Sequence, residues 1–518
     1  MDHLHSLTLA DISAENAAGF AHRVAAVDGD ARLTFAELDT RARQCASLLS
    51  EAGVAAGDRV VWAAQNSFRY IECLIASAYL GAVFCPLNWR QSADELAFVL
   101  HDTEPRAVIW QESEIGDTVL AARDLLAAES AGDAAVWIRH DGDESEYENL
   151  LSTTAPFDPD SGMSPSPDAG AAVLGIYTAA FAGTPNAALI SHTAILSQNA
   201  AMALVQRVSS ETVYLNAGPL FHVASLMTAL ATWHLGGVNV FTPRVDAEEL
   251  CRLVDAEKAT LAFLMPPTMD QMIESNSDGR YELSSLRSIP YKRAWNEMVT
   301  VDDSPWAQAP GGYGQTELMG LATCNALGGE AIATHGRSSP FVRIRIVDDS
   351  GSEVAQGETG EIVVRGPTVM NGYLNRPELT AERSRDGWHH TGDLGRREAD
   401  GSLSFIGPMT RIIKSAAENI YPAEVEAAIR SHPGVADVCV LGVPDDKWRQ
   451  RVKAVVVLSE DGSGLDADAI VEHVRNRIAS YKKPREVVFA ASLPRTGLGL
   501  VDRDAADAEY GGGGYPGA

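Results

Sequence analysis

Long apolar runs are absent from this chain of 518 residues, and positive charge is scarce. A membrane-spanning helix needs about 20 consecutive apolar residues, so no membrane span is predicted. Lysine and arginine number 41 against 70 aspartates and glutamates, which gives a formal net charge of −29. Such an acidic surface repels nucleic acids and anionic membranes, and we expect neither as a partner.

Cysteine is also scarce, and the sequence contains no CxxC pair and no Cys/His cluster. The six cysteines are Cys45, Cys73, Cys85, Cys251, Cys324 and Cys439. Scattered cysteines of this kind predict neither disulfides nor a zinc site, and they suit a reducing compartment. The N-terminal stretch MDHLHSLTLADISAEN lacks the basic and apolar regions of a secretory signal peptide. We therefore expect a cytoplasmic protein with no metal held by its own side chains.

Short apolar runs alternate with helical patterns through the first 400 residues. In LTFAELDTRARQCASLL, Thr34 stands three residues before Glu37, which is the spacing of a capping box. The apolar residues at positions 38, 42, 45 and 49 recur on one helical face. Alternation of strands and helices predicts an α/β fold with mostly parallel sheets. A Ser/Pro/Asp/Gly-rich segment near residues 140–170 is typical of a surface loop.

The sequence pattern changes twice towards the C-terminus. The stretches RIRIVDDSGSEV and GEIVVRGP are typical of hairpin strands. After Gly407, a helical pattern and strands such as DVCVLGV predict a separate α+β module. We predict an α/β protein with a large N-terminal domain, residues 1–407, whose mixed or parallel sheets carry helices and a small β unit. A small mobile α+β C-terminal domain, residues 408–518, completes the chain, and we expect it to rotate about a segment near Thr410.

The stretch YTAAFAGTPNAALISH, residues 177–192, follows an apolar run and precedes an amphipathic one. A strand, a glycine-containing loop and a helix are the usual setting of a phosphate-binding loop, which needs backbone N–H groups, hydroxyl donors and a cation. This loop has a single glycine, Gly183, and neither lysine nor arginine. The pattern therefore predicts the frame of a phosphate loop without its phosphate-binding residues.

Eight further motifs occur along the chain in this order: LTFAEL, GAVFCPLNWR, PLFHVASL, GGYGQTEL, GEIVVRGPTVMNGYLNRPE, GWHHTGDLG, IIKSAAENIYPAEVE and YKKPREVVFAASLPRT. Together they resemble the adenylate-forming superfamily of acyl-CoA ligases, peptide-synthetase adenylation domains and luciferases, over nearly the whole chain. In its members a carboxylate first attacks the α-phosphate of ATP, which gives an acyl-adenylate and pyrophosphate. The small C-terminal domain then rotates, and a thiol, usually that of coenzyme A, displaces AMP. The resemblance implies coenzyme A and an acyl-adenylate as substrates.

The resemblance also implies a nucleotide site. In the motif YGQTE the superfamily's tyrosine stacks on adenine, its threonine touches the α-phosphate and its glutamate binds Mg²⁺, while the aspartate of TGDLG binds both ribose hydroxyls. The residues at these positions are Tyr313, Gly314, Gln315, Thr316, Glu317 and Asp393. Whether Mg²⁺ is needed stays open, because the metal bridges phosphates that this protein need not bind.

Two residues are implied as catalytic, His222 at the position of the acyl gate in PLFHVAS and Lys414 in IIKS. The acyl pocket is expected between the PLFHVAS helix, the strand LAFLMPP and the GGYGQTELMG loop. Its implied lining residues are His222, Gly312, Leu318 and Met319. Leu318 and Met319 predict an apolar wall and therefore a bulky or long apolar carboxylic acid.

Three positions depart from the superfamily pattern where it handles the triphosphate. Phe181 lies among four residues that replace hydroxyl-bearing residues and a glycine of the phosphate loop, and Asn186 stands in place of its lysine. Leu500 stands in place of the lysine that reaches the carboxylate and the α-phosphate during adenylation, and no lysine follows Lys483. A leucine cannot stabilise developing negative charge.

Three hypotheses follow from these departures. In the first, the protein performs only the thioester half-reaction on a ready-made acyl-adenylate, with a separate adenylating enzyme as a possible partner. This pattern resembles the non-adenylating acyl-CoA ligases of platensimycin- and platencin-type antibiotic biosynthesis. In the second, it is a complete ATP-dependent ligase whose cations come from Arg411, Arg495 or Arg503. In the third, it is an inactive binding or scaffolding relative, which predicts losses spread evenly over all motifs.

Overall fold

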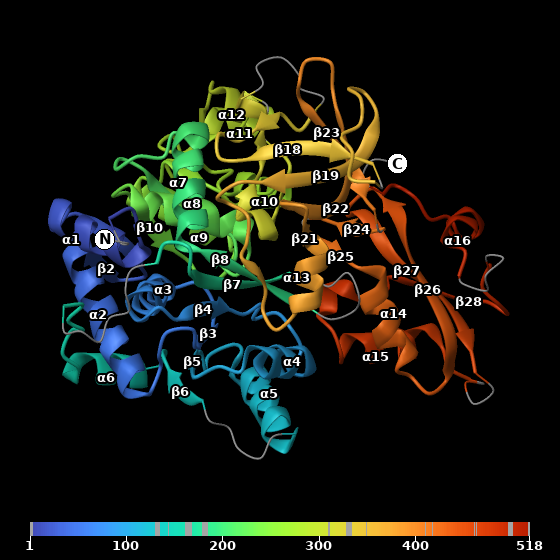
Figure 1. Cartoon of the computed structure of the whole chain (residues 1–518), viewed down its shortest axis with the longest axis horizontal. Coiled ribbons are helices and arrows are strands. Elements are labelled where there is room, and N and C mark those ends of the chain that lie inside the picture. Colours follow the sequence, from blue (N-terminus) through green and yellow to red (C-terminus); the bar gives the residue numbers. More distant parts are fainter. Residues whose placement is uncertain are drawn as a thin grey trace.

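The computed structural model describes residues 4–129, 135–142, 145–160, 168–178, 185–308, 311–327, 334–348, 350–409, 411–416, 418–459, 462, 464–495 and 501–515. In Figure 1 the elements up to residue 408, coloured blue through yellow to orange, form a large body, and the dark orange and red elements that follow form a smaller body beside it. Phe181, Gly183, Leu500 and the expected pivot Thr410 lie outside the described residues. The α/β class with a large N-terminal and a small C-terminal part is confirmed.

A seven-stranded sheet forms the centre of the large body. Its order is β20, β8, β7, β4, β3, β5, β6, and the strands from β7 to β6 pair in parallel. The bounds are Arg59–Ala63 (β3), Val83–Pro86 (β4), Ala107–Trp110 (β5), Val136–Arg139 (β6), Ala172–Thr178 (β7), Asn186–Ser191 (β8) and Gly372–Tyr373 (β20). Parallel pairing across four crossovers is what the alternating sequence pattern predicts.

A five-stranded sheet lies next to it in the order β11, β9, β10, β1, β2, with only the β1–β2 pair antiparallel. Its strands are Val24–Asp28 (β1), Ala31–Thr34 (β2), Val213–Asn216 (β9), Val238–Phe241 (β10) and Leu261–Ala262 (β11). The helices of the large body are α1 (Leu9–Gly19), α2 (Phe35–Glu51), α3 (Phe68–Leu80), α4 (Ala93–Thr103), α5 (Gly116–Glu129), α6 (Glu146–Thr153), α7 (His192–Gln206), α8 (Val223–His234), α9 (Ala247–Glu257), α10 (Pro266–Ser275), α11 (Arg293–Met298), α12 (Pro305–Gln308) and α13 (Pro377–Arg383).

Helix α2 shows how local sequence and core packing agree. Thr34 caps the helix through the backbone N–H of Glu37, and the Glu37 carboxylate accepts from the Thr34 backbone. The apolar face at positions 38, 42, 45 and 49 is buried against α1 and α3. Helix α6 corrects one expectation. It forms inside the segment predicted as a surface loop, because Ser145 caps it and Tyr147 and Leu151 are buried.

The small β unit is an antiparallel sheet, with β18 (Arg343–Val347), β19 (Thr359–Arg365), β22 (Trp388–Arg397) and β21 (Ser384–Arg385) in order and β23 (Leu403–Pro408) on β22. The predicted hairpin of the first two strands is confirmed. Three short ribbons lie nearby. They pair β12 (Arg287–Ser288) with β13 (Thr300–Val301), β14 (Gly314–Gln315) with β15 (Gly320–Leu321), and β16 (Thr323–Cys324) with β17 (Arg337–Ser338).

The C-terminal body is a mixed sheet with helices. Its strands are β24 (Ile413–Ser415), β25 (Glu418–Ile420), β26 (Val435–Asp445), β27 (Arg449–Leu458) and β28 (Glu486–Phe489), and its helices are α14 (Pro422–Arg430), α15 (Ala467–Arg475) and α16 (Arg503–Tyr510). Its own core contains Ile413, Val425, Val440 and Ile470. The α+β character predicted from the C-terminal sequence is thus present. The boundary at residue 407 stays a prediction.

The loop of residues 177–192 differs from the expected strand–loop–helix order. Strand β7 ends at Thr178, and antiparallel β8 begins at Asn186 and pairs with it before α7 starts at His192. The loop therefore joins two strands of a hairpin. No helix N-terminus follows it directly to favour an anion.

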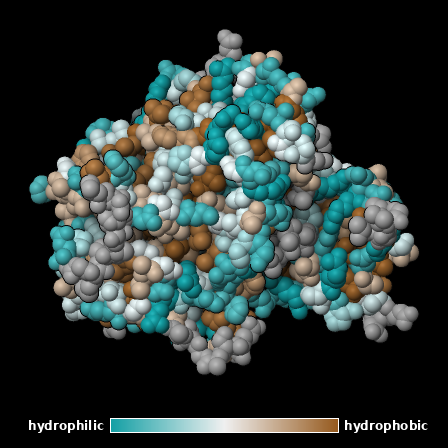
Figure 2. Space-filling view, in the orientation of Figure 1, coloured by the Kyte–Doolittle hydropathy of each residue, from teal (hydrophilic) through white to brown (hydrophobic). Residues whose placement is uncertain are grey.

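The face shown in Figure 2 mixes hydrophilic and hydrophobic residues over both bodies. Within the described parts of the chain, no helix is long and apolar enough to span a bilayer.

Candidate active site

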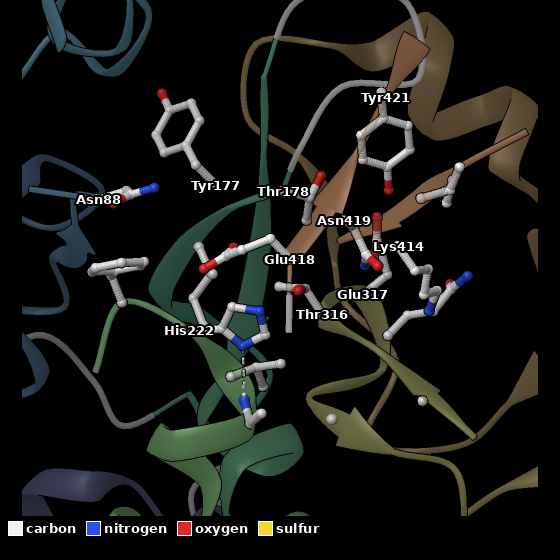
Figure 3. A pocket seen from close by; sticks show the side chains of 18 of the residues that line it. Asn88, Tyr177, Thr178, His222, Thr316, Glu317, Lys414, Glu418, Asn419 and Tyr421 are labelled. Atoms are coloured by element: carbon white, nitrogen blue, oxygen red, sulfur yellow. Dashed lines mark hydrogen bonds between the residues drawn. The ribbon is translucent and has the colours of Figure 1, made fainter. Parts of the chain in front are cut away.

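A cavity of about 550 Å³ lies between the large body and the β24–β25 hairpin. The large body lines it with the end of β7, the start of α8, the segment around β14 and β15, and β22. The C-terminal body lines it with Lys414, Glu418, Asn419 and Tyr421, which enter from one side in Figure 3. Sequence segments more than 200 residues apart, such as Thr178 and Lys414, therefore meet in one site.

Gly312 and Gly314 lie where backbone segments touch. A Cβ on Gly312 would collide with the carbonyl oxygen of Thr323, and one on Gly314 with that of Gly320. Both glycines line the cavity. Backbone packing explains why these residues are glycine, and their contacts with the acyl group and the nucleotide stay predictions.

Asp393 lies at the cavity wall on β22, held by two residues of the YGQTE motif. Its Oδ2 accepts the Tyr313 hydroxyl at 2.9 Å and the Gln315 side-chain amide at 2.6 Å. Burial raises the pKa of Asp393, and these two hydrogen bonds oppose the rise. Among the described residues nothing donates to Oδ1, so the structure presents one carboxylate oxygen, fixed in orientation, as an acceptor.

Glu317 is buried beside this pair, and its Oε1 accepts the Tyr373 hydroxyl at 2.9 Å. Burial raises the pKa of Glu317. Thr316 begins a short 3₁₀ turn with Glu317, and both side chains line the cavity. The described residues contain no cluster of three or more His, Cys, Asp or Glu side chains that could hold a metal.

Lys414 approaches Asp393 from the C-terminal body. Its backbone N–H donates to the Gln450 side chain at 2.7 Å, and its Nζ lies 5.9 Å from the centre of the Phe405 ring. Burial lowers the pKa of Lys414, and the Asp393 carboxylate opposes this. A cation and a carboxylate from different bodies thus face the same cavity.

His222 caps helix α8, and its ring faces the cavity. Its Nδ1 accepts the Ala224 backbone N–H at 3.3 Å, so the ring proton is assigned to Nε2. Burial lowers the pKa of His222, with Glu418 raising it and Arg90 lowering it further. A neutral imidazole that donates through Nε2 is therefore expected at neutral pH.

Two polar contacts that the motifs did not reveal join the bodies around the cavity. Arg90 pairs with Glu418 at 2.9 Å and lies over the rings of Phe221 and Tyr481, with its guanidinium carbon 5.3 and 5.4 Å from their centres. Both charged residues occur in motifs quoted above, GAVFCPLNWR and IIKSAAENIYPAEVE. The sequence motifs contain both residues but could not predict that they pair with each other.

The second contact is a buried triad. Lys482 bonds Glu424 of its own body at 2.5 Å and Glu95 of the large body at 3.0 Å. Glu95 also completes the capping box of α4 through Ser92. A buried charge needs its partners, so this triad favours the observed pose, in which the β24–β25 hairpin faces the cavity.

Replacing Glu95 by Gln should loosen the contact between the bodies. Glutamine keeps the capping box but removes the charged acceptor of Lys482, a loss of about 1.5–3 kcal/mol for a hydrogen bond to a charged group. We expect faster hydrogen exchange at residues 413–420 and a larger radius of gyration in solution scattering. Asp94→Asn removes an exposed charge from the same helical turn and should leave both unchanged. Equal exchange in the two variants would contradict a role for the triad.

Of the three residues that depart from the superfamily pattern, the structure describes only Asn186. Asn186 is buried as the first residue of β8, and its neighbour Pro185 and paired residue Thr178 line the cavity. Phe181 and Leu500 fall outside the described residues. Arg495 and Val501, which flank the segment of Leu500, form an isolated antiparallel bridge with each other. Arg495 there pairs with Asp437.

The apolar wall differs from the expected one. Leu318 and Met319 are fully buried in two separate core clusters, and neither lines the cavity. Met319 has a positive φ of 53°, which turns the chain so that Gly320 and Leu321 face the cavity instead. The LAFLMPP segment does not line it either. The apolar lining residues include Ile176, Phe221, Val223, Met227 and Leu321.

Comparison with known proteins agrees with this arrangement. Residues 13–374 match the AMP-binding enzyme family, and residues 424–500 match the AMP-binding enzyme C-terminal domain. A feruloyl-CoA synthase of an Amycolatopsis species is 37% identical over 492 residues, which are 93% of this chain and 94% of that protein. The indoleacetate–CoA ligase of Aromatoleum aromaticum is 36% identical, over 91% of this chain and 92% of its own length.

Solved structures give the same result. The amide bond synthetase McbA of Marinactinospora thermotolerans has a TM-score of 0.77 at 25% identity, covering 96% of this chain and 99% of its own. A Mycobacterium tuberculosis fatty acyl CoA synthetase has a TM-score of 0.66 at 27% identity, covering 97% and 98%. The chain therefore belongs to the AMP-binding enzymes, in the acyl-CoA ligase family of the adenylate-forming superfamily.

Proposed function

We propose that this acyl-CoA ligase performs the thioester half-reaction, acyl-adenylate plus CoA to acyl-CoA plus AMP, and that its adenylation activity is impaired or lost. The supporting observation is the charge around the cavity. The acidic lining residues among those described are Glu317, Asp393, Glu418 and Glu424, and the cationic ones are Lys414, Arg449 and Lys482. Lys482 is already neutralised by its two carboxylates. A lining with so few free cations suits the single negative charge of an acyl-adenylate better than the several negative charges of a triphosphate.

The phosphate loop adds no cation to this balance. Residues 179–184 are Ala, Ala, Phe, Ala, Gly and Thr, and Asn186 follows them. A triphosphate would need cations and hydroxyl donors here. Losses confined to triphosphate-handling positions, beside an intact YGQTE motif and Asp393, also argue against an inactive scaffold, for which losses would be spread evenly.

Roles for the cavity residues follow from their geometry. Asp393 would accept ribose hydroxyls through Oδ1, and Lys414 beside it would offset the charge of the AMP phosphate. The Nε2–H of His222 would donate to the acyl carbonyl oxygen. The thiolate of CoA attacks the carbonyl carbon, a C–S bond forms, and the acyl C–O bond breaks with its electron pair leaving on AMP. The thiol proton passes to solvent.

A complete ATP-dependent ligase is the alternative function, and the curated relatives named as CoA ligases and synthases favour it. It needs cations from elsewhere, and the three candidate arginines are engaged in this pose. Arg411 pairs with Asp504 and Asp507, and Arg503 pairs with Glu426. Arg495 pairs with Asp437. None of these three arginines lines the cavity. A large rearrangement of the C-terminal body would be required to bring any of them to a triphosphate.

Mg²⁺ would be held by Glu317 and by phosphate oxygens and water, since Mg²⁺ commonly uses one or two carboxylates in this way. The metal would supply charge neutralisation during adenylation. Because this charge develops during adenylation, we propose that the thioester step runs without the metal. A separate adenylating enzyme in the same cytoplasmic compartment would then supply the acyl-adenylate.

For the acyl group we propose a bulky arylalkyl or similar carboxylic acid. The apolar lining at Val223, Met227 and Leu321 suits such a group. The relatives named for feruloyl and indoleacetate groups support the same class.

The test is a split assay. One arm contains ATP, Mg²⁺, CoA and a panel of bulky acids, and the other contains the matching synthetic acyl-adenylates and CoA. Acyl-CoA formed only in the second arm supports the proposal. Acyl-CoA formed equally in both arms establishes the complete ligase instead.

Replacing Asp393 by Ala should weaken binding of AMP and of acyl-adenylate analogues. The change removes charge-assisted hydrogen bonds to ribose, which contribute roughly 1.5–3 kcal/mol, or roughly ten- to a hundredfold in dissociation constant. Isothermal titration calorimetry measures the effect. Asp468→Ala removes an exposed aspartate outside the cavity and should change nothing. Unaltered affinity in Asp393→Ala would remove this residue from the site.

A further inference from the structure

A buried glutamine lies between helices α7 and α8 without a partner for its oxygen. Gln198 is 0% exposed, and its Nε2 donates to the Met227 sulfur at 3.8 Å. Its Oε1 has no hydrogen-bond donor among the described residues. Burying an amide oxygen without a donor is unfavourable, so this side chain needs an explanation.

The surroundings of Gln198 do not supply one. Met202 and Met227 belong to an apolar cluster between the two helices, with Leu321 packed against it. A leucine or methionine would fill such a position without an unpaired polar group. The presence of an amide at this position therefore points to a donor that arrives from outside the protein.

The amide lies directly beneath the cavity floor. Gly320 has a positive φ of 107°, and a Cβ on it would lie 2.8 Å from the Met227 sulfur, 3.6 Å from Gln198 Nε2 and 3.7 Å from Val223 Cγ2. Gly320, Met227 and Val223 all line the cavity. The Met227 thioether contacts the amide and also lines the cavity, and methionine is unbranched and readily changes rotamer.

We propose that Gln198 accepts a hydrogen bond from a hydroxyl or ring N–H on the acyl group, at the end remote from its carboxyl, once Met227 has moved aside. This inference rests on the proposed function because it requires that an acyl group occupies the cavity beside Gly320, Met227 and Val223. It identifies the substrates as bulky acids with a distal hydrogen-bond donor. A pocket that pairs a buried acceptor with a substrate donor discriminates against analogues that lack the donor, because the acceptor is then left unpaired.

The experiment compares two non-hydrolysable ligands, the acyl-sulfamoyl adenosines of 4-hydroxycinnamic acid and cinnamic acid. They differ only in the distal hydroxyl. Calorimetry on the wild-type chain should give about tenfold or tighter binding of the hydroxylated ligand, as expected for one buried hydrogen bond. Gln198→Met, of similar length and without the amide, should abolish that preference. Gln206→Met, on the same helix and paired with Thr228, should preserve it.

The outcomes separate this inference from the proposed function, because binding requires no turnover. Equal affinity of the two ligands for the wild-type protein overturns the inference even if Gln198→Met fails to fold. A preference that survives in Gln198→Met also overturns it. A preference lost in that variant, with no acyl-CoA formed from any adenylate, supports the role of Gln198 and overturns the thioester proposal. Binding of neither ligand overturns the inference as well.

Discussion

With a synthetic acyl-adenylate and CoA, the wild-type protein should form acyl-CoA at least ~10³-fold faster than with free acid and ATP. The first reaction starts from a mixed anhydride whose leaving group is already activated. A free thiol has a pKa near ~8.5, so a reactive thiolate fraction exists at neutral pH, and positioning supplies most of the acceleration. The second reaction must stabilise charge spread over a phosphoryl transition state, and Asn186 and Leu500 occupy both lysine positions.

Mass spectrometry of acyl-CoA in both arms measures this ratio, with substrate pairs that share the same acyl group. Lys414→Ala should slow the arm that starts from the adenylate, because it removes the cation beside Asp393, whereas Asp468→Ala should not. Robust ATP-dependent turnover by the wild-type chain would exclude the half-reaction proposal. Failure with every adenylate tested would instead favour an inactive relative.

Restoring adenylation should require several substitutions together. Leu500→Lys alone is expected to give little ATP–pyrophosphate exchange, because the loop before β8 would still lack its cation and the hydroxyl-bearing residues and glycine replaced at positions 179–182. Adding Asn186→Lys and Phe181→Thr should raise exchange by more than the product of the separate effects. Each positioned charge contributes on the order of 10²–10³-fold at such a site. Groups that stabilise one transition state act together and are not additive.

Uncharged variants of similar size provide the control for these reversions. Leu500→Met with Asn186→Gln should leave exchange at the wild-type level, since neither adds a cation. If Leu500→Lys by itself restored full exchange, the loop would retain its function and its residue changes would be neutral. Full exchange by the wild-type chain would show that the leucine at position 500 does not impair adenylation.

Much of the fold followed from local sequence because its causes are local. The Thr34–Glu37 capping box and the buried face of α2 depend on spacings of three and four residues, and both are present in the structure. Alternating strands and helices predicted the parallel pairing of β3, β4 and β5. The hairpin at β7 and β8 was missed, because a short second strand before α7 resembles the end of a loop.

The sequence by itself determined which chemical groups the chain carries: an intact YGQTE motif, Asp393, and no lysine at positions 186 and 500. Tertiary structure alone decided which of them meet. The positive φ of Met319 sends two apolar residues into the core and turns Gly320 to the cavity. Arg90 meets Glu418 across 328 positions, and Glu95 meets Lys482 across 387. Such contacts depend on how separate bodies dock and where chain turns point, and spacing along the sequence carries no information about either.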